Sequence, residues 1–223
     1  MSSIFIASKV INYSLKTIIF KGVASLFFVA LGIYCAIITS GHTLFKVFVL
    51  IGLIFGMLGD VFLGFKYITT KTKKMWILLG MFAFAIGHVA YVVCLFVEYY
   101  VSGNVLFIIL PFISAMVMCG IYMLIANKVG INFGKNMLPF ALFYLFCLTS
   151  MVSASFFMNL LHGFSITTGI LFMIGAIFFA CSDFMLTGSY FKAGQRPKAY
   201  QAMYSVFYYL AQFIIAFSLF FLI

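Results

Sequence analysis

Charged residues are scarce in this sequence: Asp, Glu, Lys and Arg make up 7% of its 223 residues, against about a quarter in ordinary soluble domains. Hydrophobic residues make up 66%. The low charge excludes a soluble globular domain, and the abundance of aromatic residues, 20% of the chain, excludes a disordered one. The chain is therefore predicted to lie in a membrane.

Paired cysteines are absent as well. The five cysteines stand singly in apolar stretches, with no C-x-x-C pair, which excludes a disulfide scaffold and gives no indication of a redox or metal centre. The three histidines, His42, His88 and His162, fall on different predicted elements, and their spacing matches no zinc motif. We therefore expect neither a metal nor another cofactor.

Acidic residues number only three against 13 basic ones, a formal net charge of +10. In a soluble protein this excess would suggest a nucleic-acid partner. In a membrane chain it indicates contact with anionic lipid headgroups instead, so the expected partner is the lipid bilayer and not a nucleic acid. The sequence favours no particular oligomeric state.

Long apolar runs, by contrast, occur seven times, each with about the 20 residues that a membrane-spanning helix needs. The connections are short, and neither an internal repeat nor a linker divides the chain. These features predict an all-α polytopic membrane helix bundle, a single domain over residues 1–223. Residues 4–15 are too short to cross and are expected to form a short N-terminal interfacial helix. The predicted spans are residues 18–38, 44–65, 76–97, 105–126, 137–158, 165–186 and 202–223.

The basic residues predict the orientation, because cytoplasmic loops retain Lys and Arg. Twelve of the 13 fall on one side of the predicted spans, and Lys46 is the exception. We therefore expect a cytoplasmic N-terminus and a C-terminus outside. The residues assigned to the cytoplasmic side are Lys9, Lys16, Lys21, Lys66, Lys71, Lys73, Lys74, Lys128, Lys135, Lys192, Arg196 and Lys198.

Two of the three acids, Asp60 and Asp183, lie inside predicted spans. An ionisable group there costs about 2.5 to 3.5 kcal/mol on insertion scales, so it normally faces the bundle interior and marks function. Asp60 is six residues before Lys66, about 9 Å along a helix, and Asp183 is nine before Lys192, about 14 Å. Both are therefore expected in the cytoplasmic half, across one pocket.

Other polar residues lie at similar predicted depths and are expected to line an acidic, aromatic cavity open toward the cytoplasmic leaflet. Structural roles stay open beside this one: aromatic anchoring for Tyr91 and Tyr144, an interhelical hydrogen bond for His88, and snorkelling to the headgroups for Lys21. The candidate substrate-binding or supporting residues are Lys21, His88, Tyr91, Tyr144, Ser182, Tyr208 and Gln212.

The polar motifs occur in a fixed order along the chain: Lys21, Gly59-Asp60, His88 with Tyr91, Pro139 with Tyr144, the run from Gly175 through Phe178 to Ser182-Asp183, and Tyr208, Tyr209 and Gln212. Taken in this order, they resemble those of the lysoplasmalogenase family of YhhN-like membrane proteins, from about residue 20 to the C-terminus. Two departures concern the N-terminus: Lys21-Gly22 stands where the family usually has Lys-Pro, and the additional first span that is usual there is reduced to the segment before Lys16.

This resemblance implies hydrolysis of the vinyl ether bond of lysoplasmalogens to a fatty aldehyde and a glycerophospho-alcohol, with Asp60 and Asp183 as the catalytic acids. The residue types suit that chemistry. Protonation of the vinyl ether at its β-carbon creates an oxocarbenium ion that water captures, so a proton donor and an anion are needed. Two carboxyl groups in one low-dielectric pocket supply both by sharing a proton. The lipid would enter sideways from the bilayer, and Lys21 could meet its phosphate.

Two other readings use the same aspartates. An aspartyl intramembrane protease requires Gly-x-Gly-Asp, but Met57 stands where its first glycine should be. A non-enzymatic seven-span sensor or transporter that binds lipid, cations or protons stays open, because acidic pairs also relay protons. A retinal protein is disfavoured, since the last span holds no lysine for a Schiff base.

Overall fold

The computed structural model describes residues 2–66, 72–192 and 197–222, and these ranges are helical with no β-strand. Seven of the described helices are long and apolar enough to cross a membrane, which confirms the predicted all-α, seven-span fold. The helices are α1 (Ser2–Ile38), α2 (Thr43–Phe65), α3 (Lys73–Tyr99), α4 (Leu106–Lys128), α5 (Leu138–Leu161), α6 (Thr167–Phe191) and α7 (Lys198–Ser218), which the short 3-10 helix η1 (Leu219–Phe221) follows.

Each predicted span corresponds to one helix, and the boundaries differ by a few residues. Apart from the start of α1, the largest differences are five residues: α6 continues to Phe191 where the prediction ended at residue 186, and α7 ends at Ser218 where the prediction ended at residue 223. An apolar run in the sequence marks only the part of a helix that lies in the hydrocarbon core. The helix itself is longer, because its backbone hydrogen bonds continue into the polar interface. Pro139 lies in the first turn of α5, where its missing N–H removes no helical hydrogen bond.

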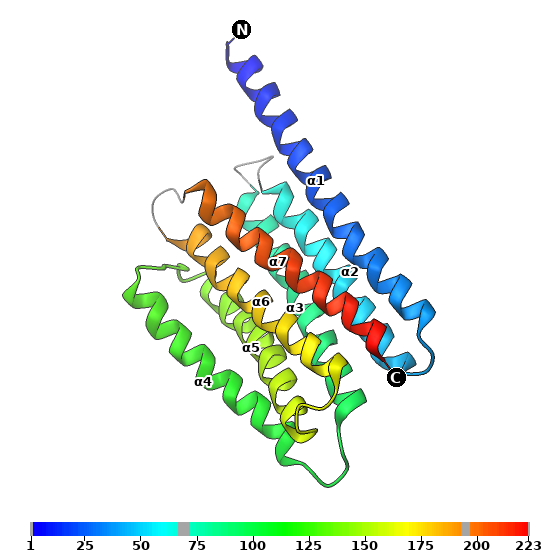
Figure 1. Cartoon of the computed structure of the whole chain (residues 1–223). Helices are drawn as coiled ribbons and strands as arrows, with labels where there is room; N and C mark the ends of the chain where they lie inside the picture. Colours follow the sequence, from blue (N-terminus) through cyan, green and yellow to red (C-terminus); the bar gives the residue numbers. More distant parts are fainter. Residues whose placement is uncertain (1, 67–71, 193–196, 223) are drawn as a thin grey trace.

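Helix α1 is unusually long, because the predicted interfacial segment forms its first turns and not a separate helix. Its 37 residues extend about 55 Å at 1.5 Å per residue, against about 30 Å for a hydrocarbon core. Figure 1 shows its N-terminal part projecting beyond the rest of the bundle. The helix runs unbroken through Lys21-Gly22.

The helices differ in how deeply they are packed. α2 and α3 pack closely together, as do α6 and α7, while α1 packs on α2 and α7. α4 lies at the edge of the bundle against α5 (Figure 1), and only 11% of its apolar window is buried, so most of α4 faces lipid.

Glycines permit the close contact between α2 and α3. A Cβ added at Gly59 would lie 2.6 Å from the ring of Phe84 on α3, and one at Gly87 would lie 3.1 Å from the carbonyl oxygen of Gly52. Small residues let helix backbones approach in this way inside membranes. The packing at Gly59 directs the next residue, Asp60, into the interior, where it is 4% exposed.

The two ends of the bundle differ in charge, and the orientation of the chain in the membrane stays a prediction. The end opposite the basic connections carries a contact of 2.5 Å between His42 Nδ1 and Glu98 Oε1. Lys46, the exception in the charge pattern, donates to the Thr39 carbonyl at 2.6 Å and so helps to close the end of α1. Among the residues used for orientation, Lys71 and Arg196 and the side chains of Lys9 and Lys198 lie outside the described residues.

Candidate functional site

Asp60 is held by side chains from the helices on either side of α2. Ser25 of α1 donates a hydrogen bond of 2.6 Å to its Oδ2, and Tyr208 of α7 also interacts with the carboxyl group. Lys21, one turn before Ser25, acts on Asp60 electrostatically. The carboxyl group of Asp60 therefore has hydroxyl partners and a nearby positive charge, although it is buried in an apolar helix.

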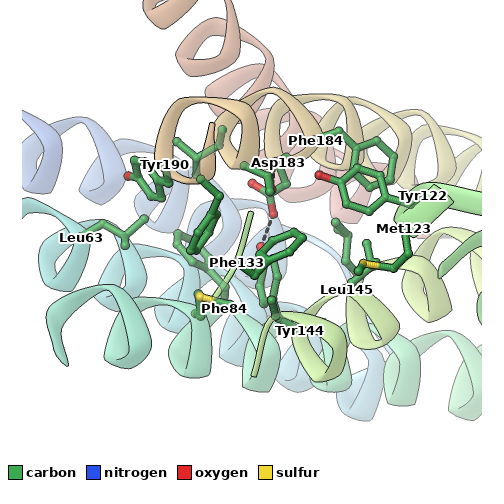
Figure 2. A pocket seen from close by; sticks show the side chains of 16 residues that line it. Leu63, Phe84, Tyr122, Met123, Phe133, Tyr144, Leu145, Asp183, Phe184 and Tyr190 are labelled. Atoms are coloured by element: carbon green, nitrogen blue, oxygen red, sulfur yellow. Dashed lines mark hydrogen bonds between the residues drawn. The ribbon is translucent and has the colours of Figure 1, made fainter. Parts of the chain in front are cut away.

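Asp183 is 6% exposed and is held by a chain of two aromatic side chains. Tyr144 of α5 donates a hydrogen bond to its Oδ2 (Figure 2). Nε2 of His88, on α3, lies 3.4 Å from the same Tyr144 hydroxyl. The His88 ring packs edge-on against Phe179, with 4.7 Å between ring centroids. This chain joins α3, α5 and α6 and fixes the direction of the Asp183 carboxyl group.

The two aspartates line one pocket, which we call the carboxylate pocket. The charge of Asp60 acts on Asp183 electrostatically across it. This is the arrangement expected from the sequence, and the catalytic role of the pair stays a prediction. The other lining residues are Lys21, Leu63, Phe84, Ser182, Leu186, Tyr190, Tyr204, Ser205, Tyr208 and Tyr209.

A buried network of amide and hydroxyl groups supports Tyr208. Tyr91 of α3 donates to Oε1 of Gln212 at 3.0 Å, and Nε2 of Gln212 donates to the Tyr208 hydroxyl at 3.3 Å. Tyr208 in turn donates to the Gly56 carbonyl at 3.2 Å. A Cβ at Gly56 would collide with Nε2 of Gln212, so a larger residue there would displace the Gln212 amide that donates to Tyr208.

Six of the seven predicted supporting residues fall into two groups, and the seventh, Tyr144, is the hydrogen-bond donor to Asp183 described above. Lys21, Ser182 and Tyr208 line the carboxylate pocket. His88, Tyr91 and Gln212, expected to line the same cavity, lie behind it and reach the aspartates through Tyr144 and Tyr208. Spacing along the sequence gives the depth of a side chain, but the direction in which it points depends on how its helix is rotated in the bundle.

Ser182 has a structural contact in addition to its place in the pocket. Its hydroxyl donates to the Tyr204 carbonyl at 2.8 Å and so ties α6 to α7. On the same face, a Cβ at Gly175 would lie 2.6 Å from the Ile215 side chain. The small residues of α6 therefore let α7 approach closely enough for its tyrosines to reach the carboxylate pocket.

A second pocket adjoins the first on the other side of Asp183, and we call it the apolar pocket. It is lined by side chains of α2 to α6 and of the connection between α4 and α5. They are mostly Phe, Leu and Met, together with the hydroxyl-bearing Tyr122, Tyr144, Thr187 and Tyr190. Asp183, Phe84 and Tyr190 belong to both pockets. In Figure 2, Asp183 lies between Tyr190 on one side and the rings of Tyr122 and Phe184 on the other.

Sequence reasoning missed three residues of this region. Ser25 lies at i+4 from Lys21 and Tyr190 at i+7 from Asp183, and both spacings place the residue on the same helix face as a recognised one. Lys66 was counted only for orientation, yet it is buried and donates a hydrogen bond to Tyr190. Burial lowers the pKa of Lys66 well below its usual value, and the positive charges of Lys21 and Lys73 lower it further. A bound anion beside Lys66 would be stabilised by the positive charges of these lysines.

A bundle of seven membrane-spanning helices with two buried carboxyl groups beside a lysine defines an integral multi-pass membrane protein with an internal acidic site. A model of the YhhN family matches residues 16–219, a range that includes every residue of this site, and the chain belongs to the YhhN family. Neither a search of curated proteins nor one of solved structures found a match.

Proposed function

We propose that the protein hydrolyses the vinyl ether bond of lysoplasmalogen, an alkenyl glycerophospholipid, and releases a fatty aldehyde and a glycerophospho-alcohol. The observation that carries the proposal is the meeting of Asp60 from α2 and Asp183 from α6 in one buried pocket. Membership of the YhhN family, which the sequence analysis linked to lysoplasmalogenases, supports a reaction of this type.

The two adjoining pockets suit the two ends of such a lipid. The phosphate would lie toward Lys21 and the nearby Lys66, because the positive charges of these two lysines repel each other and a phosphate beside them would offset that repulsion. The hydrocarbon chain would lie in the apolar pocket. Asp183 lines both pockets, so the vinyl ether, which joins chain to headgroup, would lie beside its carboxyl group.

In the proposed reaction Asp183 is the general acid. Its proton adds to the β-carbon of the vinyl ether, the π electrons form the new C–H bond, and the positive charge develops on the α-carbon and ether oxygen. Water then adds to the α-carbon while Asp60 accepts a proton from it. The resulting hemiacetal collapses to aldehyde and alcohol. A proton has then passed from Asp183 to Asp60, and its return across the pocket restores the pair.

The surroundings of the two aspartates favour this assignment over its reverse. Asp60 interacts electrostatically with the ammonium group of Lys21 and accepts a hydrogen bond from Ser25, and both interactions stabilise an anion. Asp183 borders the apolar pocket, where the chain and its double bond would lie. Asp60 is therefore better suited to be the anion that stabilises the oxocarbenium ion and accepts the proton from water, and Asp183 is better suited to be the acid.

The test is aldehyde release from lysoplasmalogen by purified protein in detergent. Asp60→Asn and Asp183→Asn keep the side-chain shape but remove the acid, and each is expected to lose about 100-fold or more in rate. Glu98→Gln is the matched control, because Glu98 is the third acid and contacts His42 at the other end of the bundle. It should keep full activity.

The assay also distinguishes the enzyme from a sensor or transporter. Circular dichroism and a single elution peak would show that the variants fold. Full activity in either folded aspartate variant would overturn the mechanism. No aldehyde from wild-type protein that binds the lipid would favour the non-enzymatic alternative.

A further inference from the structure

An apolar groove runs along the lipid-facing side of the bundle between α4 and α6, and we call it the lateral groove. Ile121 and Ile125 of α4 and Met185 and Gly188 of α6 are among its lining residues. The two isoleucines are more than half exposed, and in a bilayer they would face hydrocarbon chains. The groove therefore opens to the membrane and not to water.

Two stacked rings separate the lateral groove from the apolar pocket. Tyr122 of α4 and Phe184 of α6 have ring centroids 4.7 Å apart and ring planes inclined by 22°. Both residues line the groove and also the apolar pocket. Figure 2 shows the pair at one side of the apolar pocket, close to Asp183. Among the described residues, Tyr122 and Phe184 are the only two that line both the lateral groove and the apolar pocket.

We propose that the lateral groove admits the hydrocarbon chain of a single-chain phospholipid from the bilayer, and that the Tyr122–Phe184 pair is a movable partition in front of the apolar pocket. The proposal rests on the proposed function for the identity of the lipid. The path ends at Asp183, the residue next to Phe184, so a chain that passes the rings brings its polar end to the carboxylate pocket.

Charge supports this choice of occupant. Lys192 also lines the lateral groove, and the basic connections lie at this end of the bundle, so a chain in the groove would have cations beside its phosphate. One ring pair closes the path, which suits one chain rather than two. Stacked rings form a modest contact, and contacts with the incoming chain would replace it when the rings move apart.

The experiment measures where a lipid chain lies. The probe is an ester-linked lysophosphatidylethanolamine with a diazirine at the chain end, in vesicles of phosphatidylcholine and phosphatidylglycerol. Wild-type protein should be labelled on the peptides that carry Tyr122 and Phe184. Ile121→Trp fills the groove and should lower this labelling about fivefold or more, a change of about 1 kcal/mol.

Ile113→Trp is the matched control, because Ile113 lies on the same helix with nearly the same exposure, 52% against 53% for Ile121, outside the groove. It should leave labelling unchanged, and Tyr122→Phe, which keeps the ring, should do so too. Phe184→Ala removes half of the partition and should increase labelling inside the apolar pocket. Equal labelling in Ile121→Trp and Ile113→Trp would overturn the proposal.

Aldehyde release from lysoplasmalogen, measured on the same variants, separates this proposal from the proposed function. Aldehyde release with no effect of Ile121→Trp on labelling or rate would leave the hydrolase standing and remove the lateral path. Labelling that Ile121→Trp abolishes, in a protein that releases no aldehyde, would support the path and remove the hydrolase.

Discussion

Tyr144 donates its hydroxyl to the carboxyl group of Asp183, and this bond connects α5 to the acid of α6. Tyr144 also lines the apolar pocket, where the lipid chain would lie. A general acid needs a fixed direction, because a small displacement of a catalytic group from its reacting partner costs orders of magnitude in rate. Tyr144 is therefore a positioning residue for the reaction proposed here.

The first prediction concerns Tyr144→Phe, which keeps the ring and removes the donor. We expect kcat for aldehyde release to fall about 10- to 100-fold with little change in KM, since the loss affects orientation and not lipid binding. Tyr34→Phe on the exposed face of α1 is the control and should have no effect. A fall in kcat/KM that came entirely from KM would contradict the positioning role.

How far the sequence predicted the molecule depends on the property considered. The spans followed from apolar runs because hydropathy averages over about 20 residues, and the depths of Asp60 and Asp183 followed from the fixed rise of a helix. The rotation of each helix did not follow. His88 and Gln212 therefore proved to lie behind the pocket, while Ser25, which was not predicted, donates a hydrogen bond to Asp60.

The second prediction concerns the phosphate. Lys21→Gln removes the cation that faces Asp60, and it should raise KM for lysoplasmalogen about tenfold or more, because hydrogen bonds to charged groups contribute about 1.5 to 3 kcal/mol. An alkenyl glycerol that lacks phosphate should show no such change. Lys128→Gln, exposed at the end of α4, is the control. Equal effects of Lys21→Gln on both substrates would rule out phosphate binding by Lys21.

The third prediction concerns orientation. Because the number of spans is odd, the start of the first span and the end of the last lie on opposite sides of the membrane. The charge pattern favours a cytoplasmic N-terminus. A reporter enzyme that is active only outside should be active when fused after residue 223 and inactive when inserted between α2 and α3. The reverse result would place the carboxylate pocket in the outer leaflet and overturn the proposed side of lipid access.

The fourth prediction concerns the packing that places Asp60. Gly59→Ala would bring a Cβ within 2.6 Å of the Phe84 ring. Because an overpacked core costs about 1 to 3 kcal/mol, this variant should unfold at a lower temperature in detergent. The shift of α2 against α3 should also displace Asp60, so aldehyde release should fall even at temperatures where the variant is folded.

Gly120→Ala on α4 separates this effect from the loss of a glycine as such. A Cβ at Gly120 has no neighbour within 4 Å, and alanine in a helix interior is more favourable than glycine by about 0.5 to 1 kcal/mol. This control should therefore unfold at the same or a slightly higher temperature and keep its activity. If Gly59→Ala and Gly120→Ala shifted the unfolding temperature equally, the contact with Phe84 would not be what positions α2, and the direction of the Asp60 carboxyl group would need another cause.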